Sequence, residues 1–154
     1  MQKQFMGVAA LGAALAVADA SHAQAVQWRT QDGGNGHWYL ARVIPIGTSW
    51  QQARAMAAAS GGYLASITSA GEGALIRSLV GTDGPCWTNG HGPWLGGFRD
   101  RQTGIWTWTT GEAWTYNAWC SNQPSGDACP DPEETLCVKL DQYCASGQWW
   151  GDIT

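Results

Sequence analysis

The sequence predicts a single α+β domain, because two capped helical stretches precede several short strands and a long tryptophan-rich stretch. Its 154 residues fit one domain. Residues 93–98 (PWLGGF) predict a central strand, since proline is tolerated at a strand's first residue and large apolar side chains suit a buried sheet. Gly96 and Gly97 predict that another backbone or a large ring lies close to this strand.

Two helices are predicted from their capping residues. Ser49 stands three residues before Gln52, at the start of an alanine-rich stretch, and Gly61 follows where a glycine stop belongs. Ser69 and Glu72 have the same spacing and predict a second capping box before an apolar helical face.

Short strands and a hairpin complete the predicted domain. The Gly- and Asn-rich turn at residues 32–36 predicts a hairpin within residues 28–43. Further strands are predicted at residues 63–67, 105–109, 136–140 and from 148. Residues 110–132 form a long stretch without regular pattern, and loops of this length are usually functional or disordered. Its tryptophans favour an ordered loop.

Composition and charge exclude several classes of function. The chain has 11 Trp, 8 Lys and Arg in total, and a net charge of −4. The basic residues form no run or stripe, which argues against a nucleic-acid-binding protein. No segment is long and apolar enough to predict a membrane-spanning helix.

Residues 1–25 predict a signal peptide, and residues 26–154 the mature domain. Lys3 supplies the positive start, residues 5–18 are apolar, and small residues follow at residues 21–25. The alternative is a buried N-terminal helix. A signal peptide implies a secreted or periplasmic protein, in which disulfides are permitted.

The family resemblance rests on a series of short motifs in a fixed order. They are Trp38-Tyr39, Ser49-Trp50-x-x-Ala53, Gly61-Gly62-x-Leu64-Ala65-x-Ile67, Trp94-Leu95-Gly96-Gly97, Trp106-x-Trp108-x-x-Gly111, Tyr116-x-x-Trp119, Gln123-Pro124, Cys137-Val138 and Trp150-Gly151-Asp152. Together they resemble the C-type lectin-like domain over residues 28–154, and the opening GGNGHWY looks like bacterial secreted members. The resemblance implies two helices flanking antiparallel strands, with a long ordered loop that carries calcium and sugar.

The resemblance also implies a set of binding residues in and near that loop. The carbohydrate-binding positions correspond to Gln123, Ser125, Glu134 and Asp152, and the calcium ligands to Gln123, Glu134 and Asp152. Calcium takes six to eight oxygen ligands, so carboxylates and amides at these places make chemical sense. Pro124 lies where the family has a cis proline.

This chain departs from the family pattern at several ligands. Ser125 offers a neutral hydroxyl where the family has Asn or Asp, Thr135 stands where the family has Glu, and Gly151 replaces an Asn. We therefore expect weakened calcium dependence. Acidic residues nevertheless crowd the loop at Asp127, Asp131, Glu133 and Glu134. They indicate either a solvated acidic loop or a rebuilt calcium site, and both interpretations stay open.

Two other functions compete with a lectin. Asp131 and Glu134 are candidate carboxylates for glycoside hydrolysis. However, His37 and His91 lie in no catalytic motif, and we expect no enzyme. The other alternative is a calcium-free module for protein interaction or scaffolding. Tryptophans that can stack on a sugar are Trp114, Trp119, Trp149 and Trp150, although family positions make each of them a core candidate.

The chain has five cysteines, an odd number for an exported protein. None forms a Cys-x-x-Cys pair, which argues against structural zinc. In the family, the cysteine at the position of Cys137 bonds a cysteine that would lie beyond Thr154, so we expect a domain that lacks its last strand. With that family frame, the predicted disulfides are Cys86–Cys144, away from the sugar loop, and Cys120–Cys129, within it.

Overall fold

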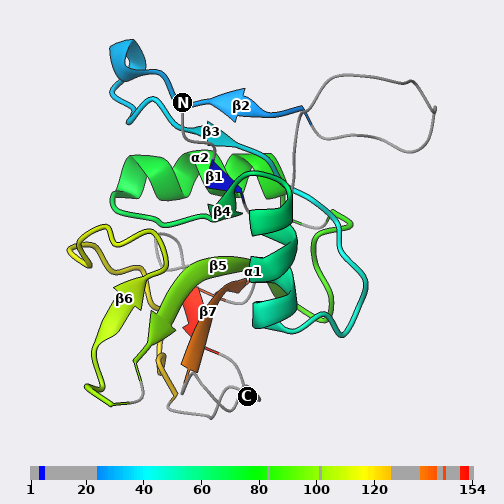
Figure 1. The fold of residues 1–154 in the computed structure, drawn as a ribbon, viewed down its shortest axis with the longest axis vertical. Helices are drawn as coiled ribbons and strands as arrows, with labels where there is room; N and C mark the ends of the chain where they lie inside the picture. Colours follow the sequence, from blue (N-terminus) through cyan, green and yellow to red (C-terminus); the bar gives the residue numbers. More distant parts are fainter. Residues whose placement is uncertain are drawn as a thin grey trace.

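The computed structural model describes residues 4–5, 24–82, 84–100, 102–125, 136–141, 144 and 150–152. In Figure 1 the N-terminal hairpin and helix α2 lie at one end of the molecule, and a four-stranded sheet lies at the other. Helix α1 packs beside the sheet. The predicted α+β class, with two helices flanking antiparallel strands, is confirmed.

The sheet has the strand order β6-β5-β7-β8, and every neighbouring pair is antiparallel. Its strands are β5 (His91–Arg99), β6 (Trp106–Trp108), β7 (Leu136–Asp141) and β8 (Trp150–Asp152). Strand β5 lies between β6 and β7, so the central position predicted for residues 93–98 is correct.

Two glycines of β5 occupy crowded positions on opposite sides of the strand. A Cβ atom on Gly96 would lie 2.6 Å from the Leu64 carbonyl oxygen, and one on Gly97 would lie 2.9 Å from the rings of Trp108 and Trp114. The predicted close approach of a backbone and of a large ring is thus found, one at each glycine.

Both helices begin at the predicted caps. In α1 (Trp50–Ala59), Ser49 and Gln52 form a full capping box. In α2 (Ala70–Val80), the Ser69 hydroxyl accepts the Glu72 N–H, as expected. The Glu72 carboxylate instead accepts the N–H and hydroxyl of Thr68, one residue earlier, so the second capping box is only half formed.

The buried Glu72 carboxylate also joins α2 to the N-terminal hairpin. Its Oε1 atom accepts the hydroxyl of Tyr39 and the amide of Asn35. Burial, followed by the negative charge of Glu72, raises the pKa of Tyr39 above its ordinary value. The hairpin is therefore attached to the helix through a polar network in which Tyr39 and Glu72 are fully buried.

A hairpin is found, but its first strand, β2 (Val26–Gln27), lies just before the predicted residues 28–43. Strand β3 (Trp38–Tyr39) follows a turn that contains the short helix Thr30–Asp32. Strand β4 (Tyr63–Leu64) pairs in parallel with β1 (Gln4–Phe5). Strand β1 lies inside the predicted signal peptide, whose other residues up to residue 23 fall outside the described part of the chain.

The core divides into two clusters, and alternate residues of β7 enter one or the other. Val138 and Leu140 join the larger cluster, which contains most of the tryptophans, whereas Cys137 joins the cluster beneath α1. Cross-strand partners share a face of a sheet. The face of Val138 and its partner Asp152 is therefore opposite to that of Lys139.

Candidate functional site

The loop that precedes the site runs parallel to strand β8. Trp119 forms a parallel bridge with Trp150. The Trp150 N–H donates to the Ala118 carbonyl at 2.8 Å, and the Cys120 N–H donates to the Trp150 carbonyl at 2.9 Å. Because loop and strand run in the same direction, the next loop residues reach Asp152 at the end of β8.

Gln123, Ser125 and Asp152 meet there and hydrogen-bond directly to one another. The Asp152 N–H donates to the Gln123 side-chain oxygen at 2.9 Å. The N–H and the hydroxyl of Ser125 both donate to Asp152 Oδ1, each at 2.9 Å. Asp152 is 2% exposed, and the Gln123–Pro124 bond is cis, as the resemblance implied. We call these three residues the loop triad.

The structure thus brings together three of the four predicted carbohydrate-binding residues. Glu134, the fourth residue and a predicted calcium ligand, lies outside the described residues. The other acidic residues of the loop, Asp127, Asp131 and Glu133, also lie outside them. The alternatives of an acidic loop, a rebuilt calcium site and a glycosidase carboxylate pair therefore stay as sequence predictions.

The loop triad alone fits a calcium ion poorly. It offers one carboxylate, one amide oxygen and one hydroxyl, fewer oxygen groups than calcium takes. The amide oxygen already accepts backbone N–H groups of Asp152 and Ser125, at 2.9 and 3.3 Å. These donors satisfy the polar atoms that a cation would otherwise hold.

The disulfide of the structure joins Cys120 to Cys144, so both predicted pairs are wrong. Their Cα atoms lie 5.1 Å apart, within the usual range. The predicted pairing requires Cys144 to lie away from the loop. Because the loop runs beside β8, Cys120 instead lies next to Cys144. Cys129 lies outside the described residues.

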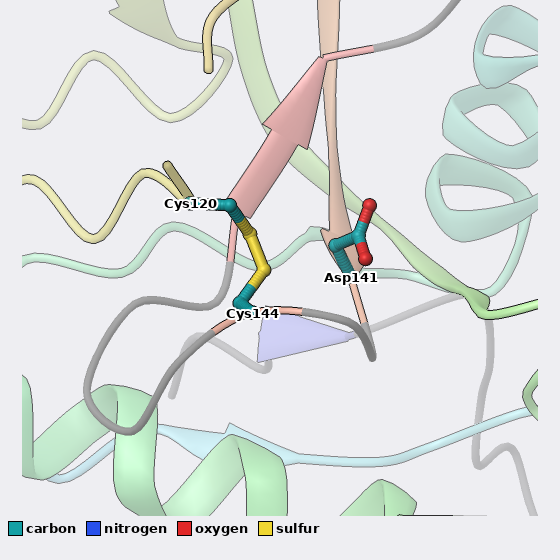
Figure 2. Close-up of side chains that lie close together, drawn as sticks. All are labelled: Cys120, Asp141 and Cys144. Atoms are coloured by element: carbon teal, nitrogen blue, oxygen red, sulfur yellow. A yellow bond between two sulfur atoms is a disulfide. The ribbon is translucent and has the colours of Figure 1, made fainter. Parts of the chain in front are cut away.

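Asp141 lies beside this disulfide (Figure 2), and the possible ligand atoms of the three residues are within 4.8 Å of one another. The thiolate is the form of cysteine that ligates a metal. With both sulfur atoms in the disulfide, the group is not a metal site.

Five tryptophans form one ring cluster, and one of them, Trp150, lies on the same strand as Asp152: Trp106, Trp108, Trp114, Trp119 and Trp150. Trp108 and Trp150 are buried in the core, and for Trp150 the family position suggested this. Trp114 and Trp119 are only partly buried and keep part of a ring surface toward solvent. Trp149 lies outside the described residues.

One polar pair, on the face of the β7–β8 ladder opposite to Asp152, was not predicted from the sequence. Lys139 is 5% exposed, and its Nζ atom lies 2.5 Å from His91 Nδ1. Burial lowers the pKa of Lys139, and burial followed by the charge of Lys139 lowers the pKa of His91. The available signal is a lysine between apolar residues in the predicted strand at residues 136–140.

Residues 46–152 match the family of the Lectin C-type domain. The chain belongs to this family. It is 30% identical to the type-2 ice-structuring protein of Hemitripterus americanus over 105 residues, which is 68% of this chain and 55% of that protein. It is 29% identical to ladderlectin of Oncorhynchus mykiss over 114 residues, covering 71% of this chain and 53% of that protein. The chain thus spans about half the length of these relatives.

Among solved structures, the lectin domain is similar to a calcium-independent type II antifreeze protein. The TM-score is 0.51 at 30% identity, and the match covers 69% of each chain. No helix in the described part of the chain has the length and apolar character needed to cross a membrane.

Proposed function

We propose that this protein is a secreted carbohydrate-binding module of the lectin type with weakened calcium dependence, and not an enzyme. The observation that carries the proposal is the meeting of Gln123, Ser125 and Asp152, the family's sugar-binding positions, in one hydrogen-bonded group. The family supplies the class of function, and this site supplies the chemistry.

The weakened calcium dependence follows from the charge and the bonding of the loop triad. Charge count and site rigidity tune calcium affinity steeply. The triad carries one carboxylate, and its oxygen atoms already accept hydrogen bonds from the chain. A calcium ion would have to displace the Ser125 donors from Asp152. The similarity to a calcium-independent antifreeze protein is consistent with this view.

Sugar contacts would then come from polar groups and from ring surface. Gln123 stays partly exposed, and its amide N–H₂ can donate to sugar hydroxyls while its oxygen faces the chain. The partly buried Trp114 and Trp119 stack on each other and offer apolar ring surface in the same loop as Gln123. By family analogy, glutamine in the triplet favours galactose-type sugars.

Secretion is supported by the predicted signal peptide at residues 1–25. The GGNGHWY opening adds the likeness to bacterial secreted members, for which secretion or a periplasmic location follows. Terminal sequencing of the exported product tests this part. We expect a start at Gln24 or Val26, and an intact Met1 would contradict it.

The function is tested by screening immobilised glycans with and without a calcium chelator. We expect binding that the chelator reduces only slightly. Gln123→Ala should abolish most of this binding, whereas Ser121→Ala, an exposed change in the same loop, should leave it intact. Binding lost completely with chelator would refute the weakened dependence, and equal binding by Gln123→Ala would move recognition to the tryptophans.

A calcium-free module for protein interaction or scaffolding is the second candidate. It is favoured by the same observation, since a triad whose oxygen atoms are occupied by its own chain needs no ligand to be stable. Absence of binding to every glycan in the screen, by a protein that unfolds cooperatively, would favour this candidate.

A further inference from the structure

A cavity of about 240 Å³ opens on the face of the β7–β8 ladder opposite to the loop triad. Its walls come from the segment before α1 and from the start of β5. Apolar side chains dominate these walls: Val43, Ile44, Pro45, Ile46 and Trp94. The polar part of the lining includes Lys139 and His91, together with Arg42, Thr48 and, from the loop before β5, Thr88 and Asn89.

The Lys139 ammonium is the unusual feature of this cavity. An ammonium has three N–H donors. Among the described residues, its only hydrogen-bond acceptor is His91 Nδ1, at 2.5 Å. The negative charges of Asp141 and Asp152 act on the ammonium, but neither carboxylate is hydrogen-bonded to it. A side chain 95% withdrawn from solvent, with two donors left over, is costly unless something accepts them.

The charge around the cavity favours an anion as that acceptor. Arg42 also lines the cavity, so two of the chain's few cationic side chains converge on it in a protein of net charge −4. An arginine or lysine binds a carboxylate through short, charge-assisted hydrogen bonds. His91 accepts from Lys139 and keeps the ammonium directed at the cavity lining.

The apolar walls favour an anion with an apolar body. Val43 is 53% exposed and Ile46 is 85% exposed, so these two apolar lining residues are accessible to a ligand from solvent. Trp94 is fixed in the wall by its indole N–H, which donates to the Thr48 carbonyl at 3.0 Å. Apolar walls with polar groups that can orient a ligand are the arrangement found in small-molecule sites.

We propose that this cavity binds a small organic carboxylate, with the carboxylate on Lys139 and the apolar body against Ile44, Pro45 and Trp94. The site is separate from the loop triad, and it requires neither calcium nor carbohydrate binding by that triad. It adds a second ligand of different chemistry to the opposite face of the same sheet.

The test is a calorimetric titration of the whole protein with benzoate, compared with the neutral benzyl alcohol. We expect benzoate to bind with a dissociation constant near ~1 mM. Benzyl alcohol should bind at least about tenfold more weakly, because it cannot form the charged hydrogen bond. Acetate, which has the charge without the apolar body, should also bind more weakly.

Lys139→Met keeps the length and the apolar stem of the side chain and removes its charge. We expect it to weaken benzoate binding by about tenfold or more, while Gln123→Ala on the other face leaves that binding unchanged. Cooperative thermal unfolding of Lys139→Met checks that the variant is folded. His91→Gln retains an acceptor for Lys139 and should keep most of the affinity, which gives a second variant if the first fails to fold.

Four results would overturn the proposal. Equal binding of benzoate and benzyl alcohol would show an apolar cleft without anion recognition. Equal binding of benzoate and acetate would remove the role of the walls. Unchanged benzoate binding by a folded Lys139→Met variant, or no binding by the native protein, would show that Lys139 is a structural residue only.

Discussion

The two faces of the β7–β8 ladder hold polar groups that are treated in opposite ways. On one face, Asp152 accepts two bonds from Ser125, and its own N–H donates to Gln123. On the other face, one residue along the ladder, Lys139 donates to His91 beside a cavity. The residues of the first group hydrogen-bond to one another. In the second group, Lys139 keeps N–H donors that no described residue accepts.

This difference indicates where a ligand contributes to stability and where it does not. A buried carboxylate with its donors in place is already stable without a cation. A buried ammonium with a single acceptor carries a cost that a bound anion would relieve. The family position of a residue therefore says less about ligand dependence than the hydrogen bonds it makes.

The largest effect is expected from the residue that aligns the loop with β8. Trp150 is 1% exposed, contacts four other aromatic rings and pairs its backbone with the loop. Trp150→Ala should lower the free energy of unfolding by about 3–5 kcal/mol. Denaturant unfolding measures this loss. Trp106→Ala, in the same cluster but only partly buried, is the matched control and should cost less.

The second prediction separates the two faces by the direction of their effects. Asp152→Ala removes the acceptor of both Ser125 donors and should cost about 1–3 kcal/mol of unfolding free energy. Ser125→Ala, which removes only one of the two donors, should cost less. If chemical denaturation shows the same free energy of unfolding for Asp152→Ala and the native protein, the triad contributes nothing to the stability of the fold.

Lys139→Met should have the opposite sign and increase the unfolding free energy by about 1 kcal/mol. It replaces a buried charge by an apolar side chain of similar shape, which is often neutral or stabilising. His91 loses its donor but is exposed, so water can replace that bond. A loss of more than about 1 kcal/mol would mean that Lys139 is well satisfied in the native protein.

The pH dependence of that gain is smaller and checks its cause. Burial lowers the pKa of Lys139 from an ordinary value of 10.5, while Asp141 and Asp152 act in the other direction. The native protein therefore bears the cost of the charge below the lowered pKa and loses that cost as pH rises through it toward 10.5. The difference in unfolding free energy between Lys139→Met and native protein should shrink over this range.

Two other groups that titrate do not disturb this comparison of unfolding free energies between Lys139→Met and the native protein. His91 is already neutral in that range, because burial and the charge of Lys139 lower its pKa. The raised pKa of Tyr39 makes the fold lose stability above pH 10, but this loss occurs in both proteins and cancels. A difference that stays constant with pH would contradict a buried charge as its origin.

Much of the fold was predictable because its signals are local. Ser49 and Gln52 lie three residues apart in the sequence, and this short spacing is all that the capping box requires. Gly96 and Gly97 mark close approaches whatever lies opposite, although only the structure identifies the Leu64 carbonyl and the tryptophan rings. The motifs in order were sufficient to indicate the family, which the match over residues 46–152 confirms.

The features that were predicted wrongly or not at all depend on contacts between segments that are distant in the sequence. The Cys120–Cys144 pairing follows from a loop that runs parallel to β8, and no local pattern gives that direction. Glu72 was predicted to cap its own helix, but Thr68 and the distant Tyr39 supply its donors. Lys139 looked like one polar residue in a short strand, and only the packed sheet buries it.

The central claim, that the loop triad is complete without a cation, is tested most directly by calorimetric titration of the metal-free protein with calcium. We predict either no binding or a dissociation constant of about 10⁻⁴–10⁻³ M. At 1 mM calcium the unfolding free energy should then rise by no more than about 1.4 kcal/mol. A sub-micromolar dissociation constant would contradict the account, because it would require a set of ligands that replaces the hydrogen bonds among Gln123, Ser125 and Asp152.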